Sequence, residues 1–243
     1  WYGEWAMRPV IRGPYPINDD GTVFAVSCYK QFKGPLIKRI GAYCSYCEMK
    51  LDSNLAVEHV KPKKVDGVIQ ADRLLDWDNL LLACTNCNSS KGNENIKISE
   101  YFWPDIDNTC RPFEYSEGGC ITAAQWLSPD MKEKAERTLA LTGLDKTPAD
   151  TTEASDLRWL RRKEAWEIAQ LSLSDLRSNN IEAMRVQIVR TMTGHGYWSI
   201  WMTVFSGDAD MRRRFIQAIA GTDSNCFDAT NGYEAVQRTG GAI

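Results

Sequence analysis

Cys44-Ser-Tyr-Cys47 and Cys84-Thr-Asn-Cys87 are two Cys-x-x-Cys pairs that enclose the most informative part of this sequence. Between them lies Glu58-His59-Val-Lys-Pro62, and the second pair continues directly into Asn88-Ser-Ser-Lys91-Gly92. Four thiolates in two close pairs are the ligand set of a tetrahedral structural Zn²⁺ site. The spacing therefore predicts that Cys44, Cys47, Cys84 and Cys87 bind one zinc ion.

The distance between the two pairs is larger than in a simple zinc ribbon. Cys47 and Cys84 are separated by 36 residues, whereas a simple ribbon has roughly 15–20. A strand-loop-strand unit inserted between two zinc knuckles explains the surplus. The alternatives are two unrelated Cys-x-x-Cys pairs or a redox pair, but a redox protein would not need two pairs around one hairpin.

Local patterns predict the elements around these motifs. Leu36–Tyr46 is expected to form a short helix that leads into the first knuckle. Leu55–Val60 is typical of a strand ended by Pro62, and Asn79–Thr85 is a compact apolar strand. Residues 65–78 are polar and rich in turn formers, so we expect a loop that could hold a short helix. Asn88 opens a short helix that ends or bends at Lys91-Gly92.

The remainder of the chain is expected to be mostly helical. Amphipathic patterns predict helices at Met131–Leu141, Leu157–Leu176 (capped by Ser155-Asp156), Ile181–Met192 and Asp210–Ile219. The predicted fold is α+β, in three parts. These are an irregular N-terminal segment at residues 1–39, a zinc-pinned domain at 40–125, and an α-helical region at 126–243.

Charge is distributed unevenly along the chain. The net charge of −3 divides into +4 for residues 1–64, −7 for residues 65–130, and balance thereafter. Such a chain is not expected to grip nucleic acid strongly through charge alone. Positive charge is concentrated next to His59, at Lys61, Lys63 and Lys64.

Cysteine usage and hydropathy bear on the compartment. Four cysteines form metal-type pairs and four are scattered, in a chain large enough to fold without disulfides. We therefore expect a reducing cytoplasm. No apolar run is long enough for a transmembrane helix, and the beginning of the sequence has no signal-peptide pattern.

In combination, the motifs C-x-x-C, V-E-H-V-x-P and W-D-N-L-L-L-A-C-x-x-C-N-x-x-K-G resemble the zinc-containing branch of the HNH endonucleases, which have the ββα-metal fold. The resemblance covers roughly residues 40–95. It extends to HNH nucleases of bacterial antiphage systems, including Septu and retron-associated nucleases. Such proteins act with an ATPase of the ABC type, so the resemblance implies such a partner.

The resemblance also implies a role for each motif residue. His59 would be the general base that activates water, and Glu58 and Asn88 would bind a catalytic Mg²⁺ or Mn²⁺. Asn79 would brace the loop and orient His59, and Lys91 would face the scissile phosphate. Three lysines would contact DNA, namely Lys61, Lys63 and Lys64.

Two points stay open at this level. Many relatives have Asp where this chain has Glu58, and Asp76 and Asp78 are close enough in sequence to be rival metal ligands. Taken singly, Glu58-His59 could be a surface pair, Asn79 a cap, and Lys91 a solvated charge. Their conjunction between and after two zinc knuckles favours catalysis.

Other chemically able residues have simpler interpretations. His195, in a Gly- and aromatic-rich stretch, is expected to be structural or to contact a partner. Two arginine runs, 158/161/162 and 212–214, are expected on solvated helical faces paired with Glu164 or Asp210. The aromatic residues of 197–205 are expected in a core or an interface.

The sequence thus predicts an HNH endonuclease that hydrolyses DNA phosphodiester bonds. One alternative is a zinc module that docks nucleic acid or protein without cutting it. Another is a subunit that is silent alone and uses its helical half as a docking surface.

Overall fold

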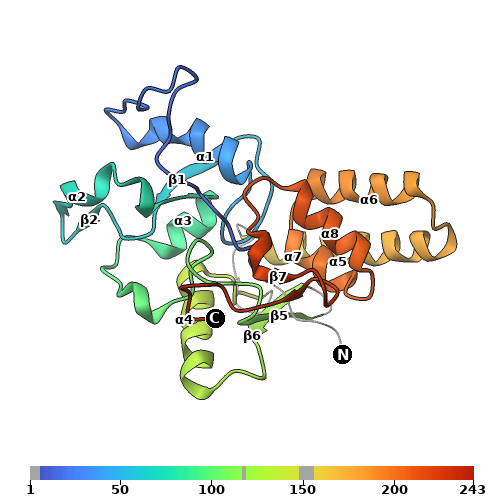
Figure 1. Cartoon of the computed structure of the whole chain (residues 1–243). Helices are drawn as coiled ribbons and strands as arrows, with labels where there is room; N and C mark the ends of the chain where they lie inside the picture. The colour runs from blue at the N-terminus through green and yellow to red at the C-terminus, as the bar shows by residue number, and fades with distance from the viewer. Residues whose placement is uncertain (1–5, 117–118, 148–155) are drawn as a thin grey trace.

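The computed structural model describes residues 6–116, 119–147 and 156–243, and it confirms the α+β class (Figure 1). In these residues the strands form antiparallel pairs: β1 (Ala56–His59) with β4 (Leu80–Ala83), β2 (Lys64–Val65) with β3 (Val68–Ile69), β5 (Phe113–Ser116) with β6 (Cys120–Ala123), and β7 (Phe227–Asp228) with β8 (Glu234–Ala235).

The helices of the described residues are α1 (Lys33–Ile40), α2 (Ala71–Leu74), α3 (Thr85–Lys91), α4 (Pro129–Thr142), α5 (Arg158–Ser178), α6 (Glu182–His195), α7 (Trp198–Val204) and α8 (Ala209–Ala218). The 3₁₀ turns are η1 (Tyr29–Phe32), η2 (Trp77–Asn79), η3 (Ile98–Glu100) and η4 (Ser224–Cys226).

The predicted hairpin and helix form a ββα unit from β1, β4 and α3. Glu58 lies opposite Leu81 and His59 lies opposite Leu80. All four residues of β4 are buried, as a short continuous apolar run indicates. Helix α3 begins at Thr85, earlier than the start predicted at Asn88, because Cys84 is its N-cap. It ends at Gly92, whose φ of +61° is readily adopted by glycine.

The connection between β1 and β4 is a hairpin followed by short helical turns. Asp66 and Gly67, both with positive φ, close the turn between β2 and β3, as in a type I′ turn. Helix α2 and turn η2 follow and return the chain to β4. The loop predicted at residues 65–78 therefore holds the short helix that we allowed for.

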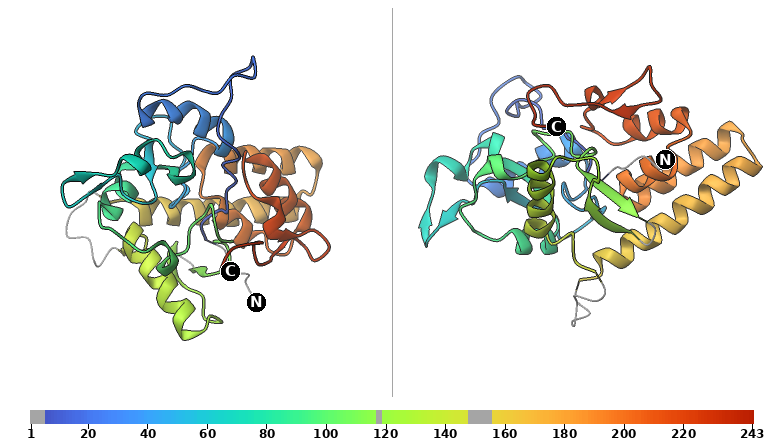
Figure 2. Two further views of the ribbon diagram at one scale, coloured as in Figure 1. Left: turned by 60° about the vertical axis from the view of Figure 1, so that its left-hand side comes forward. Right: turned by 90° about the horizontal axis from the view of Figure 1, so that it is seen from below.

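Helices α4, α5, α6 and α8 occupy the four segments predicted to be helical. Ser128 caps α4 and Gly143 ends it in the left-handed conformation. The predicted cap of α5 falls partly on Ser155, outside the described residues, while Asp156 accepts a hydrogen bond from the backbone N of Arg158. Helices α5 and α6 lie side by side and project from the body of the molecule (Figures 1 and 2).

Two local expectations for the N-terminal part were wrong. Residues 1–39 are not irregular throughout, because η1 lies within them and α1 begins there at Lys33. The helix expected at Leu36–Tyr46 begins earlier and ends at Ile40, since Gly41 follows with φ +80°. The first Cys-x-x-Cys pair therefore lies in a turn that α1 precedes.

The arginine runs divide between two environments. Arg161, Arg213 and Arg214 pair with Glu164 or Asp210 on helix surfaces, as predicted. Three others are buried, against expectation, with exposed fractions of 3% or less: Arg158, Arg162 and Arg212. Each of these guanidinium groups donates to a backbone carbonyl, as buried polar groups usually do.

The apolar core is continuous from the ββα unit to the helical half. The aromatic stretch 197–205 lies in that core: α7 is buried throughout, and Trp198, Trp201 and Phe205 are almost fully enclosed. The boundaries at 39/40 and 125/126 stay predictions. None of the helices in the described residues is long and apolar enough to cross a membrane.

Candidate functional site

The four cysteines of the two pairs converge on one point. Cys44, Cys47, Cys84 and Cys87 are all buried, and their Sγ atoms lie within 4.8 Å of one another. The Sγ atoms of Cys47 and Cys84 are 3.7 Å apart. A tetrahedron with zinc–sulfur bonds of about 2.3 Å places its sulfurs about 3.8 Å apart, so the residues present fit a structural zinc ion.

No further cluster of this kind competes with it. Within residues 6–116, 119–147 and 156–243, the cysteines are the one group of three or more Cys, His, Asp or Glu side chains close enough to share an ion. Asp76 and Asp78 are exposed, and Asp76 accepts a hydrogen bond from the backbone N of Asp78. They do not gather with Glu58 and His59 as rival ligands.

The zinc knuckles are bonded to the helical half, which sequence reasoning missed. Arg158 of α5 donates from Nη1 to Cys87 Sγ at 3.0 Å. Glu48, directly after Cys47, accepts hydrogen bonds from the backbone N and the hydroxyl of Ser199 in the first turn of α7. A carboxylate at a helix N-terminus is favourably placed. These long-range bonds leave no signal in the spacing of the motifs.

His59 lies at the end of β1 with its ring fixed. Its Nε2 is 3.1 Å from the carbonyl oxygen of Leu74 at the end of α2. Because a carbonyl can only accept, Nε2 carries the proton and Nδ1 keeps its lone pair. Nδ1 is buried and has no partner among the described residues.

The environment of His59 favours the neutral imidazole. Burial lowers the pKa of His59 to about 4; the hydrogen bond to Leu74 opposes this, and the charges of Lys63 and Lys91 add to it. The pKa of His59 therefore lies below the ordinary value near 6.5 of a free imidazole. At neutral pH the ring is unprotonated at Nδ1.

Glu58 and Lys91 form a buried ion pair beside His59. The Lys91 Nζ lies 2.9 Å from Glu58 Oε1, and their side chains are 2% and 6% exposed. Lys91 also donates to the backbone oxygen of His59 at 2.9 Å. Burial raises the pKa of Glu58, and the charge of Lys91 counteracts the rise. Lys91 therefore points inward, whereas we expected it to face a phosphate.

The two asparagines occupy different positions around this pair. Asn79 accepts from the backbone N of Lys61 at 2.7 Å and donates to its carbonyl at 2.9 Å, so it braces the chain that follows His59. Asn88 lies one turn before Lys91 on α3, on the face that meets Glu58. Its half-buried side chain makes no hydrogen bond within the described part of the chain, which leaves its oxygen available as a ligand.

The three lysines after His59 differ in exposure. The side chains of Lys61 and Lys64 are exposed. Lys63 is half-buried, and its Nζ lies 4.7 Å from the centre of the Tyr29 ring. Tyr29 in turn meets the His59 ring edge-on, with centroids 4.8 Å apart. Tyr29 was not among the expected site residues.

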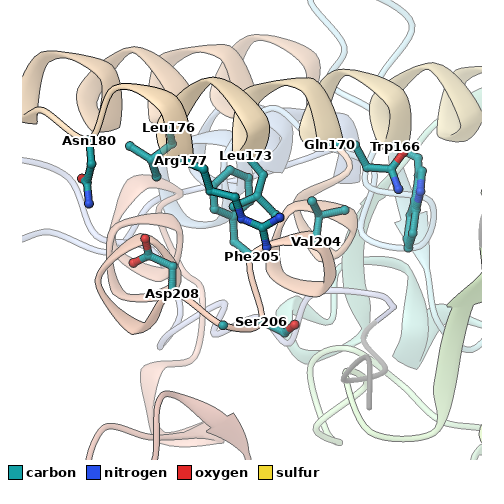
Figure 3. Close-up of a pocket in the computed structure, with 11 residues that line it drawn as sticks. Trp166, Gln170, Leu173, Leu176, Arg177, Asn180, Val204, Phe205, Ser206 and Asp208 are labelled. Carbon is teal, nitrogen blue, oxygen red and sulfur yellow. The ribbon is translucent and has the colours of Figure 1, made fainter.

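A groove lies away from the motif residues, between α5 and the segment that joins α7 to α8. Its volume is about 530 Å³, and Trp166, Leu173 and Phe205 contribute apolar walls (Figure 3). The one carboxylate that lines it, Asp208, pairs with Arg185 and caps α8. The groove therefore lacks the groups that the motif residues bring together. His195 is exposed at the end of α6 and does not line it.

Comparison with known proteins agrees with this geometry. Residues 44–94 match the HNH endonuclease family, and the chain carries an HNH domain. A stretch of 78 residues is 33% identical to the Septu protein PtuB of Bacillus thuringiensis. The match covers 30% of this chain and 29% of that relative, so the chain spans less than a third of the relative's length. The resemblance to HNH nucleases drawn from the sequence is confirmed.

Proposed function

We propose that this protein is a metal-dependent endonuclease that hydrolyses phosphodiester bonds in DNA, with His59 as the general base. The observation that carries the proposal is the state of the His59 ring. The carbonyl of Leu74 accepts a hydrogen bond from the protonated Nε2, so Nδ1 keeps a free lone pair. His59 and Glu58 are neighbours on the same strand, β1. This arrangement supports proton abstraction from water.

In the proposed reaction, a water oxygen attacks phosphorus while His59 Nδ1 takes the water proton. The bond from phosphorus to the 3′ oxygen then breaks and leaves a 5′ phosphate. Glu58 and Asn88 would hold the divalent cation, Mg²⁺ or Mn²⁺, which when bound would neutralise the charge that develops on the leaving oxygen. Asn79 would keep the chain after His59 in place. An approaching phosphate would raise the pKa of His59 from its low value, because a nearby anion favours the protonated ring.

The wider setting is also a proposal. Kinship with a Septu protein supports a role as the nuclease subunit of an antiphage complex that includes an ABC-type ATPase. None of the eight cysteines, all of which lie in the described part of the chain, forms a disulfide, which supports a reducing cytoplasm. Lys61 and Lys64 would contact the DNA backbone next to the cut.

One observation favours a subunit that is silent alone. His59, Glu58 and Lys91 are all 5% exposed or less, so substrate cannot reach them without a rearrangement. A partner that binds the helical half, which is bonded to the zinc knuckles, could promote such an opening. Cleavage that requires the partner would support this version.

The experiment is a plasmid-cleavage assay with Mg²⁺ or Mn²⁺, in the presence and absence of the proposed ABC-type ATPase partner. His59→Ala should lower the cleavage rate about 10²- to 10⁴-fold, the usual contribution of a general base, while zinc content stays unchanged. His195→Ala is the matched control, because it removes the other histidine from an exposed position. Metal-dependent cleavage by His59→Ala at the wild-type rate would exclude the proposed base.

A further inference from the structure

Tyr29 contacts the ring of His59 from outside the segment that matches the HNH family. It lies in η1, before the matched residues 44–94 begin. Its ring meets the imidazole at an interplanar angle of 70°, with centroids 4.8 Å apart. Edge-to-face contacts of this kind are favourable because the positive edge of one ring meets the negative face of the other.

The orientation of the His59 ring depends on such a packing contact. Its one hydrogen bond, from Nε2 to Leu74, fixes one corner of the ring. The other ring nitrogen, Nδ1, is buried without a partner among the described residues. An unpaired buried nitrogen disfavours this orientation, so packing from elsewhere must stabilise it. In the part of the chain that the structure describes, Tyr29 is the aromatic ring in contact with His59.

Lys63 extends the same arrangement. Its ammonium lies 4.7 Å from the centre of the Tyr29 ring, a cation–π distance. Lys63, Tyr29 and His59 therefore form a series of contacts that ends at the imidazole. Lys64, the next residue, is exposed and takes no part in it.

We propose that Tyr29 is a positioning residue for His59, which holds the imidazole so that the carbonyl of Leu74 accepts the hydrogen bond from Nε2 and Nδ1 keeps its lone pair. The inference rests on the proposed function, because it concerns the orientation of the base. It assigns a role in that site to the N-terminal segment. A different role, in which Tyr29 only blocks access to His59, makes the opposite prediction for cleavage.

The first readout is chemical labelling with diethyl pyrocarbonate, which reacts with unprotonated histidine nitrogens. The chain has two histidines, so exposed His195 is an internal reference for buried His59, and mass spectrometry separates the two. In Tyr29→Ala the labelling of His59 relative to His195 should rise, by up to about tenfold, the largest factor that such an aromatic pair is worth.

Two variants control for the substitution. Tyr29→Phe keeps the ring and should label like the wild type. Tyr15→Ala removes another N-terminal ring, one that packs on Phe32 and Trp77 but not on His59, and should also leave the labelling ratio unchanged. Zinc content checks the fold of each variant. Should Tyr29→Ala lose zinc, Lys63→Met takes its place in the labelling experiment, and Lys64→Met is the control for Lys63→Met.

The second readout is cleavage kinetics. Tyr29→Ala should lower kcat about tenfold, with KM for DNA nearly unchanged, because misorientation of the base affects the chemical step. A higher kcat in Tyr29→Ala would overturn the proposal in favour of simple blockage. Unchanged labelling of His59 in Tyr29→Ala would overturn it as well. The labelling result does not depend on whether His59 cuts DNA, so the failure of this inference is distinguishable from failure of the proposed function.

Discussion

The ion pair between Lys91 and Glu58 is the feature of single residues that most alters our view of the site. A motif read as sequence places Lys91 one helical turn after Asn88, and this spacing suggests a side chain aimed at substrate. In the folded chain both charges are buried and contact each other directly. A divalent cation that binds Glu58 must therefore share the carboxylate with an internal ammonium group.

Removal of one member of this pair should leave an uncompensated buried charge. We expect Lys91→Met to lower the free energy of unfolding by about 3–5 kcal/mol, and Glu58→Gln/Lys91→Met to recover part of that loss. Urea unfolding monitored by tryptophan fluorescence measures both. Lys97→Met is the control, since the Lys97–Glu100 pair is exposed and should contribute about 0.5 kcal/mol or less. Equal losses in the single and double variants would show that the pair is not coupled.

At the scale of elements, the zinc site joins the end of β4 to the start of α3. Cys84 lies between them, and its sulfur also accepts a hydrogen bond from the backbone N of Cys87. A short helix such as α3 has little intrinsic stability. We therefore expect its position next to β1, and with it that of Asn88 and Lys91, to depend on a metal bound by the four cysteines.

Substitution of one ligand should release the metal and loosen this unit. We expect the wild type to hold about one zinc ion per chain, and Cys47→Ser to hold almost none, because three protein ligands do not complete a structural site. Cys28→Ser is the control: Cys28 is exposed and lies outside the cluster, so its zinc content should match the wild type. Elemental analysis by mass spectrometry gives the ratio. Full zinc content in Cys47→Ser would contradict the assignment.

At the scale of the whole molecule, the ββα unit and the helical half share buried polar bonds as well as a core. Arg158 joins α5 to Cys87 and to the carbonyls that end α4. Asp156 pairs with Arg158 and accepts from Asn86 of α3. The guanidinium group of Arg8 donates hydrogen bonds to the carbonyl oxygens of Ile40 and Ala220, which are far apart in the sequence. Such bonds couple the unfolding of both halves.

This coupling can be tested at Arg158. Arg158→Met should lower the stability by about 3 kcal/mol or more, because Asp156 loses its partner and buried acceptors become unsatisfied. Arg161→Met, on the same helix but exposed and paired with Glu164, should change it by less than about 1 kcal/mol. Thermal unfolding followed at 222 nm should give one transition in the wild type and a broader or split transition in Arg158→Met. Similar curves for both variants would argue that the two halves are independent.

The sequence by itself determined the features that depend on local spacing. The two Cys-x-x-Cys pairs predicted the four-cysteine cluster, because residues three positions apart in a turn can place their sulfurs close together. The two strands and the helix of the ββα unit were predicted from short apolar runs and helix-start residues. Helices α4, α5, α6 and α8 were predicted from amphipathic patterns and caps. Asn79 braces the chain at Lys61 as its place in the motif indicated.

The tertiary structure alone decided what depends on contacts between distant segments. The inward turn of Lys91, the burial of Arg158 against Cys87, the capping of α7 by Glu48 and the contact of Tyr29 with His59 all join residues far apart in the chain. The same residue types occur in solvated and in buried positions, so composition and periodicity do not indicate which distant residue each side chain contacts. The motif residues around His59 were thus predictable from the sequence as candidates, while the packing that orients and encloses them was set by the fold.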